Sequence, residues 1–175
     1  EILHLGTSLS YRNVGGDHTL RFSERPEAHI TDTRIVDTQT KPTPTTTRDI
    51  DANSVTRGVL EAAYINGPFH VQGEYYHTSI DRQLAGMKDL SFNGYYVEAG
   101  LFLTDDTLNY KATTGSYSRV TPTGQNGAWQ IAARFSTVDL NDKDITGGEA
   151  DSVTLGLNWF AAPNIRFSAN YINVL

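Results

Sequence analysis

The stretch GGEADSVTLGLNWFAAPNIRFSANYINVL, residues 147–175, carries the pattern that decides the fold. Apolar and polar side chains alternate through residues 153–159, and the alternation resumes over 165–171 after Ala162-Pro163-Asn164. Successive side chains of a β-strand point to opposite faces, so each half of the stretch is predicted to be a strand with one apolar face. Pro163 lacks a backbone N–H and Asn164 tolerates turn geometry, so a tight turn is expected between the strands. The stretch predicts an antiparallel hairpin.

The same alternation recurs along the rest of the chain. About eight strand-like segments are expected, at residues 2–12, 19–30, 57–65, 69–77, 92–104 and 128–140 and in the closing hairpin. Segments of about nine to twelve residues exceed the roughly 5–6 residues of soluble strands and approach the length of a tilted transmembrane strand. No segment shows the 3.6-residue period of an ordinary helix. We therefore predict an all-β fold, an antiparallel up-and-down transmembrane β-barrel, with residues 1–175 forming part of a single domain.

The connections between the predicted strands differ in length. Two of them, 66–68 and 162–164, are tight, whereas 78–91, 105–127 and 141–150 are longer. Short turns at one end and longer loops at the other are typical of outer-membrane barrels. The connection 105–127 is the exception, because it is long at the tight-turn end, and it is interpreted as an inserted excursion. The Thr-, Asp- and Pro-rich segment 31–56 is predicted to be a long, mobile external loop.

Composition excludes several function classes. The chain has no Cys, which rules out disulfides and thiolate chemistry. Its 14 basic and 20 acidic residues give a net charge of −6, which argues against nucleic acid as a partner. The five His have no metal-ligand spacing, and no nucleophile or phosphate-loop motif occurs. We expect no enzymatic activity and no cofactor.

One acidic segment is a weak candidate for calcium. Residues 139–149, DLNDKDITGGE, supply Asp139, Asn141 and Asp144, whose side-chain oxygens suit a hard cation. The spacing is not that of an EF-hand. A solvated acidic loop is the favoured interpretation.

If the apolar face of each strand contacts lipid, the other face lines a water-filled lumen. The basic residues predicted on that face are Arg12, Arg21, Arg25, Arg134 and Arg166, and the acidic ones are Glu61, Glu74 and Glu98. Guanidinium groups stay charged and match phosphate oxygens, and a row of them lowers the barrier to anion entry. The alternative for each arginine is a structural ion pair with a lumen glutamate. The sequence leaves both roles open.

Amphipathic aromatic residues gather near the ends of the predicted strands. They are Tyr11, Tyr64, Tyr75, Trp129, Trp159 and Tyr171. Such rings suit the two membrane–water interfaces. The alternative is ordinary cross-strand packing of aromatic side chains. The membrane-interface role is favoured.

Several longer stretches resemble one protein family. They are RPEAH (25–29), EAAYINGPFHVQGEY (61–75), GYYVEAGLFLT (94–104), YKATTGSYSRVTP (110–122), GAWQIAARFSTVDLND (127–142) and GGEADSVTLGLNWFAAPNIRFSANYI (147–172). Together they are similar to the phosphate- and pyrophosphate-selective porins of the porin O and P type. The resemblance implies a trimeric barrel of about sixteen strands in the outer membrane of a Gram-negative bacterium. It also implies passage of anions, phosphate or pyrophosphate, along lumen arginines.

The resemblance also bears on the extent of the chain. Porins of this family are about twice as long and normally end in a strand with a terminal aromatic residue, so the sequence is interpreted as a fragment, about the C-terminal half without its last strand. The runner-up is a soluble, lipocalin-like, eight-stranded ligand-binding barrel, because Gly127-Ala128-Trp129 matches the G-x-W of lipocalins. In lipocalins, however, that motif opens the first strand. A lipocalin interior would also be more apolar than a face with Glu74, Glu98 and Arg134.

Overall fold

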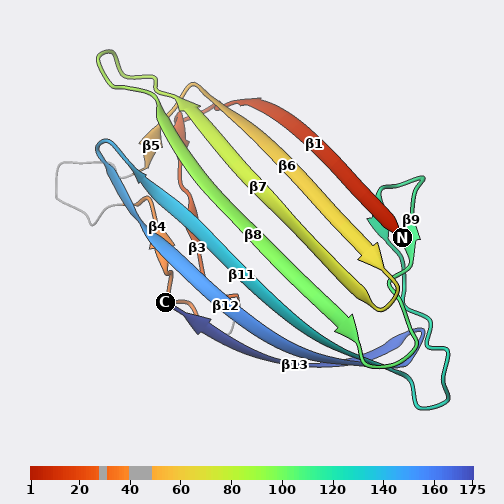
Figure 1. The fold of residues 1–175 in the computed structure, drawn as a ribbon. Helices are drawn as coiled ribbons and strands as arrows, with labels where there is room; N and C mark the ends of the chain where they lie inside the picture. The colour runs from red at the N-terminus through yellow and green to blue at the C-terminus, as the bar shows by residue number, and fades with distance from the viewer. Residues whose placement is uncertain (28–30, 40–48) are drawn as a thin grey trace.

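A computed structural model describes residues 1–27, 31–39 and 49–175. Seven long strands form one sheet in the order β1-β6-β7-β8-β11-β12-β13. Their bounds are β1 Ile2–Asn13, β6 Ser54–Asn66, β7 Phe69–Asp81, β8 Leu90–Phe102, β11 Ala128–Asp142, β12 Ile145–Ala162 and β13 Ile165–Val174. All neighbours are antiparallel and follow one another in the chain, so the sheet is an up-and-down meander. Figure 1 shows it as a curved wall, and in the described part of the chain β1 and β13 are its two edges.

The predicted all-β, antiparallel up-and-down class is confirmed, with seven long strands in the described sheet instead of about eight. The expected strand at 19–30 is wrong. Its described residues form only β2 (Thr19–Leu20) and β3 (Ser23–Glu24), which pair with β5 (Ile50–Asp51) and β4 (Val36–Asp37) and not with the wall. Pro26, which cannot donate to a strand ladder, interrupts the segment. Residues 28–30 lie outside the described residues.

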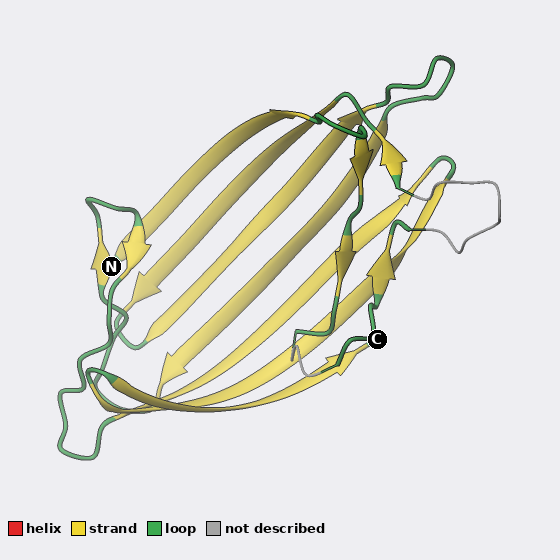
Figure 2. Ribbon diagram, turned by 180° about the vertical axis from the view of Figure 1, so that it is seen from behind, coloured by secondary structure: helices red, strands yellow, loops and turns green. Residues whose placement is uncertain are grey.

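The connection between β1 and β6 lies against the inner face of the wall. Its buried side chains Val14, Leu20, Val36 and Ile50 join one hydrophobic cluster with wall residues that include Val55, Ile80, Leu90 and Phe92. The ring centroids of Phe22 and Phe92 are 5.6 Å apart, in an edge-on arrangement. Figure 2 shows the short strands of this segment in front of the sheet, on its concave side. The described part of the predicted external loop 31–56 is therefore internal, because its apolar residues are buried against the wall; residues 40–48 lie outside the described residues.

The other connections partly match the predictions. Two tight turns follow β6 and β12, as expected. The predicted long loop at 141–150 is wrong, because β12 already begins at Ile145 and a two-residue turn, with Lys143 at φ 54°, closes the hairpin. The loop between β7 and β8 is shorter than the predicted 78–91 and covers 82–89. The excursion 105–127 is long at the tight-turn end, as predicted, and contains the hairpin of β9 (Tyr110–Lys111) and β10 (Ser116–Tyr117).

The outer face of the wall is apolar and exposed. Leu9 is 78% exposed and Phe167 59%, and Leu3, Leu5, Leu60, Leu101, Ile131, Leu155 and Leu157 are exposed on the same face. Monomeric soluble proteins rarely expose contiguous apolar patches larger than a few hundred Å². A continuous apolar face opposite a polar one is what a lipid-embedded wall requires. None of the described residues forms a helix that could span a membrane.

A buried arginine joins three separate connections at the loop end of the wall. The Arg82 side chain is only 4% exposed. Its Nε donates to Asp51 Oδ1 at 2.9 Å and its Nη1 to Asp144 Oδ1 at 3.1 Å, while the Leu84 amide donates to Asp51 Oδ2 at 2.9 Å. Burial opposes ionisation of Asp51, but the Leu84 amide and the Arg82 guanidinium outweigh it and lower the pKa of this carboxyl. The cluster fixes β5, the 82–89 loop and the β11–β12 turn to one another.

The two faces can be tested with single cysteines, since the chain contains none. Cysteines at Leu155, Leu157 and Phe167 will react with membrane-soluble thiol probes, whereas those at Thr154, Asn158 and Arg166 will react with water-soluble ones. The two sets differ because successive side chains along a strand point to opposite faces of the sheet. Labelling yields in proteoliposomes provide the measurement. Equal labelling of both sets by both probes would contradict the two-faced wall.

The Arg82 cluster predicts a local stability effect. Arg82→Ala leaves two carboxylates without their partner and costs about 2–3 kcal/mol. Hydrogen-exchange protection of the Ala52 and Asn53 amides, which donate to the His18 and Asp81 carbonyls, will fall by about 30-fold or more. Lys88→Ala, in the same loop, is the matched control and will leave these amides protected. Unchanged protection in Arg82→Ala would show that the cluster does not hold this region.

The same amides should respond to pH. The pKa of Asp51 is lower in the folded protein than in the unfolded chain, so its ionisation stabilises the fold above the unfolded value of about 3.9. That contribution is lost as the pH falls through the folded pKa. Protection factors of Ala52 and Asn53 will therefore decrease below about pH 4. In Asp51→Asn this component of the pH dependence will be absent.

Candidate channel lining

Strand register places several charged and polar residues of the wall in two neighbouring rows across its inner face. One row runs from His4 through Gln72, Glu98 and Arg134 to Thr154. The next contains Glu61, Glu74, Tyr96, Ser136 and Ser152. Side chains directly opposite one another on adjacent strands interact, so the charges of this face are coupled across strands.

Arg134 is enclosed by two carboxylates. Its Nε lies 3.4 Å from Glu27 Oε1 and its Nη1 3.8 Å from Glu98 Oε2, and its guanidinium carbon lies 4.2 Å from the centroid of the Tyr96 ring. Glu98 is the partner that sequence reasoning named. Glu27, which it missed, comes from the inward-folded β1–β6 connection. The sequence offered no signal for this contact beyond the presence of Glu27 in the stretch RPEAH.

Glu27 also ties the inward-folded segment to the wall. Its two carboxylate oxygens accept hydrogen bonds from Ser136 Oγ at 2.8 Å and from Thr154 Oγ1 at 2.9 Å. Hydrogen bonds to a charged acceptor are about twice as strong as neutral ones. The contact of Arg134 with Glu27 is therefore part of the structure that holds the segment in place.

Arg21 and Arg25 do not lie on a wall strand, so their predicted placement is wrong. Both belong to the inward-folded connection, where Arg21 Nε donates to Asp37 Oδ1 at 2.8 Å and Arg25 Nη2 lies 3.1 Å from Asp32 Oδ1. The hydrogen bond from Arg21 lowers the pKa of Asp37. Both arginines thus have a carboxylate partner within their own segment.

Arg12 and Arg166 lie on wall strands, as predicted. Arg12 stands opposite Val55 on β6, and Arg166 stands opposite Phe160, with its guanidinium carbon 5.9 Å from the ring centroid. Within the described residues, neither has a carboxylate oxygen within ion-pair distance. They are the predicted lumen arginines whose donors remain available.

The other two predicted acidic residues have partners other than arginine. Glu74 accepts hydrogen bonds from the hydroxyls of Tyr76 and Tyr96, the latter at 2.7 Å. Glu61 Oε1 lies 3.1 Å from His4 Nε2. His4 Nδ1 in turn lies 2.6 Å from the Tyr110 hydroxyl of the excursion 105–127. Among the described residues, the alternative of an ion pair with a lumen arginine is therefore not found for Glu61 or Glu74, whose partners are histidine and tyrosine side chains.

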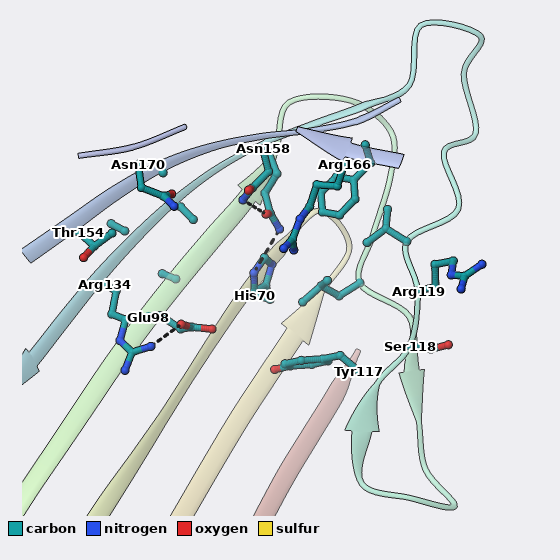
Figure 3. Close-up of a pocket in the computed structure, with 18 of the residues that line it drawn as sticks. His70, Glu98, Tyr117, Ser118, Arg119, Arg134, Thr154, Asn158, Arg166 and Asn170 are labelled. Carbon is teal, nitrogen blue, oxygen red and sulfur yellow. Dashed lines mark hydrogen bonds and ion pairs between the residues drawn. The ribbon is translucent and has the colours of Figure 1, made fainter. Parts of the chain in front are cut away.

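The excursion 105–127 encloses a cavity at the tight-turn end of the inner face. Val120 packs against Phe102 and Ala128 of the wall, with Leu108 and Phe160 beside them. The cavity has a volume of about 700 Å³ and is bounded by this excursion and by β7, β8, β11, β12 and β13. Figure 3 shows the Tyr117 ring extending from the excursion toward the wall, where His70, Asn158 and Arg166 lie, whereas the side chains of Ser118 and Arg119 point away from the wall. Sequence reasoning named only Arg134, Glu98 and Arg166 of its lining.

The predicted interface aromatics are placed on the outer face of the wall by the strand register. Trp129 and Trp159 stack at 5.4 Å with an interplanar angle of 13°, and Phe167 stacks on Trp159 at 5.4 Å, near the tight-turn end. The apolar outer face of the strands also contains Tyr11, Tyr64, Tyr75 and Tyr171. Their role at the membrane interfaces stays a prediction.

The candidate calcium residues are engaged elsewhere. Asp139 Oδ1 accepts from the Asn141 amide at 2.8 Å, Asn141 Oδ1 accepts from the Gly148 amide at 3.0 Å, and Asp144 pairs with Arg82. Across residues 1–27, 31–39 and 49–175, no group of three or more His, Cys, Asp or Glu side chains could hold a metal ion. The segment forms a hairpin turn.

Comparison with known proteins agrees with this architecture. The model of the family described as phosphate-selective porin O and P matches residues 1–175. An uncharacterized protein of Caulobacter vibrioides is 33% identical over 176 residues, which cover 97% of this chain and 33% of that protein. Porin O of Pseudomonas aeruginosa is 27% identical over 123 residues, which cover 65% of this chain and 28% of that protein.

The chain therefore spans about a third of the length of the curated relatives that it matches. The lipocalin-like alternative is wrong, because the family match covers the whole sequence and Gly127-Ala128-Trp129 precedes the fifth long strand, not the first. A sheet with an apolar outer face and a polar inner face fits a porin wall. The chain belongs to the phosphate-selective porin O and P family.

Proposed function

We propose that the chain forms part of an outer-membrane channel of a Gram-negative bacterium, through which phosphate or polyphosphate-like anions diffuse passively. The observation that carries the proposal is the two-faced wall, with an exposed apolar face opposite a face rich in polar and charged residues. The family match and the resemblance to Porin O support it. The protein acts as a channel and not as an enzyme, and needs no cofactor.

We further propose that the wall belongs to a larger barrel of about sixteen strands that assembles as a homotrimer, as the family resemblance implies. The edges β1 and β13 support the first part of this proposal. An edge strand in lipid would leave backbone N–H and C=O groups unpaired, which costs several kcal/mol for each group. Further strands on both edges remove that cost.

The arginines divide into two groups in the proposed permeation path. Arg21, Arg25 and Arg134 already have carboxylate partners, so their main contribution is to hold the inward-folded segment and to add to the field of the lumen. Arg12 and Arg166 have donors available for a passing anion. Ion passage requires binding that is weak enough for release, and single arginines at separated positions meet that condition.

The stand-alone chain tests the larger-barrel proposal. Residues 1–175 expressed alone will not give a heat-modifiable, protease-resistant barrel in detergent, because both sheet edges remain unpaired. Gel mobility with and without heating, followed by limited proteolysis, is the measurement. A stable monomeric barrel with its own conductance would contradict the proposal.

The charge of the lumen arginines can be tested by alanine substitution. Removing one charge about 8 Å from the ion path in water changes the ion's energy by ~0.5 kcal/mol, or about twofold in permeability. Arg21→Ala, Arg25→Ala, Arg134→Ala and Arg166→Ala in the complete porin will each lower the anion-to-cation permeability ratio modestly, and double changes will lower it further. Reversal potentials in planar bilayers measure the ratio, with folding checked by heat modifiability. Unaltered selectivity in all four folded variants would show that the conduit lies elsewhere.

The two groups of arginines can be separated by a substitution that keeps the charge. Lysine loses the planar fork that binds an oxyanion through two hydrogen bonds. Arg166→Lys will therefore weaken the phosphate block of chloride current. Arg134→Lys is the matched control and will leave the block unchanged, because Glu27 and Glu98 already enclose this side chain. Equal effects of the two changes would contradict the division into available and paired arginines.

A further inference from the structure

The cavity enclosed by the excursion 105–127 contains a directed chain of hydrogen bonds across the wall. Ser168 Oγ donates to Asn158 Oδ1 at 2.7 Å, and Asn158 Nδ2 donates to Gln130 Oε1 at 2.8 Å. Gln130 Nε2 then lies 3.5 Å from His70 Nε2. An amide nitrogen can only donate, so His70 Nε2 is the acceptor at the end of the chain. With the Gln130 amide oriented by its Asn158 contact, the tautomer that accepts from Gln130 is the one with its hydrogen on Nδ1.

The Nδ1 hydrogen of His70 has no recipient among the described residues. His70 is only 7% exposed, and its Nδ1 is buried without a hydrogen-bond partner. The ring sits against Gly100 of the adjacent strand, where an added Cβ would lie 2.3 Å from the imidazole. A buried donor without a partner is destabilising, so an unpartnered donor at a cavity points to a ligand atom that accepts its hydrogen.

The other available groups of the cavity have the same chemical character. Arg166 and Arg119 line it, and neither has a carboxylate within ion-pair distance among the described residues. The Tyr117 hydroxyl lines it too and is buried without a partner. Arg166, His70 and Tyr117 thus offer N–H and O–H donors and one fixed positive charge. Figure 3 shows Arg166 and His70 together on the wall side of the cavity, with the Tyr117 ring extending toward the wall from the excursion and the Arg119 side chain pointing away.

The carboxylates that line the cavity are already engaged. Glu98 Oε1 accepts from Gln72 Nε2 at 2.6 Å, and its Oε2 faces Arg134. Glu27 faces Arg134 and accepts from Ser136 and Thr154. The cavity therefore combines available donors with carboxylates that already have partners. That combination suits an anion whose oxygens only accept hydrogen bonds.

We propose that this cavity is a resting site for a small inorganic oxyanion at the tight-turn end of the lumen, held by Arg166, the Tyr117 hydroxyl and the His70 Nδ1 hydrogen. The proposal rests on the proposed channel function and adds a defined site to it. Because the available groups donate, the site attracts oxyanions by charge and hydrogen bonding without requiring a protonated oxygen. It will therefore bind sulfate about as well as phosphate.

The test is direct binding of inorganic phosphate and of sulfate to the complete porin, folded in detergent, by titration calorimetry. Arg166→Gln removes a charged donor and will weaken phosphate binding about 10-fold. His70→Phe keeps a ring beside Gly100 but removes the Nδ1 hydrogen, and it will weaken phosphate binding about a few fold. Tyr117→Phe removes only a hydroxyl outside the wall strands, so it tests the site even if a wall variant fails to fold. Lys88→Gln removes a matched charge in the 82–89 loop and will leave binding unchanged.

The outcomes separate the site from the channel. Unchanged phosphate affinity in folded Arg166→Gln and Tyr117→Phe overturns the site. Affinity for phosphate more than about tenfold above that for sulfate overturns the donor-only chemistry, because it requires an acceptor for the phosphate hydrogen. A third outcome separates the two proposals. If the wild-type protein binds phosphate, and these substitutions weaken that binding, the site is supported. If the same protein shows no anion current in bilayers, the proposed channel function is contradicted.

Discussion

The requirement that every backbone polar group in lipid be hydrogen-bonded within the wall governs the rest of this structure. The five interior strands of the sheet meet it along their lengths, because each of them pairs with a neighbour on both sides. The requirement also fixes the side chains. A strand that is paired on both edges has only its two faces available, so alternate residues must suit lipid on one side and water on the other.

The curved wall leaves space on its inner side, and two connections occupy part of that space. The β1–β6 connection enters from one end of the strands and the excursion 105–127 from the other. Different interactions hold them in place. The first has a hydrophobic cluster, the contact of Glu27 with Arg134 and the buried Arg82, whereas the second has a smaller cluster and the Tyr110–His4 contact.

The charges of the inner face have distinct roles despite their similar position in the sequence pattern. Arg134 is enclosed by carboxylates and supports the inward-folded segment, whereas Arg166 is available to a solute. The net charge of −6 is no guide to this difference. Local pairing decides which guanidinium groups keep their donors available, and pairing depends on residues far apart in the sequence, such as Glu27 and Arg134.

The sequence by itself determined the strands of the wall, their apolar face and the family. A period of two is a local property, so residues 153–159 and 165–171 indicate their hairpin without any knowledge of the fold. The same local signal was misleading at 19–30, where Leu20 and Phe22 alternate with polar residues but are buried against the wall and not in it. Alternation shows that one face is apolar. It does not show what that face contacts.

Only the tertiary structure decided the composition of the channel lining. Arg12, Arg134 and Arg166 all lie on the polar face of their strands, yet only Arg134 contacts carboxylates among the described residues. One is Glu98 on the adjacent strand, and the other is Glu27 on a segment that folds back more than a hundred residues away in the chain. The cavity beside His70 likewise depends on the excursion 105–127 and on the missing side chain of Gly100. Such contacts depend on the path of the connections, which strand periodicity does not encode.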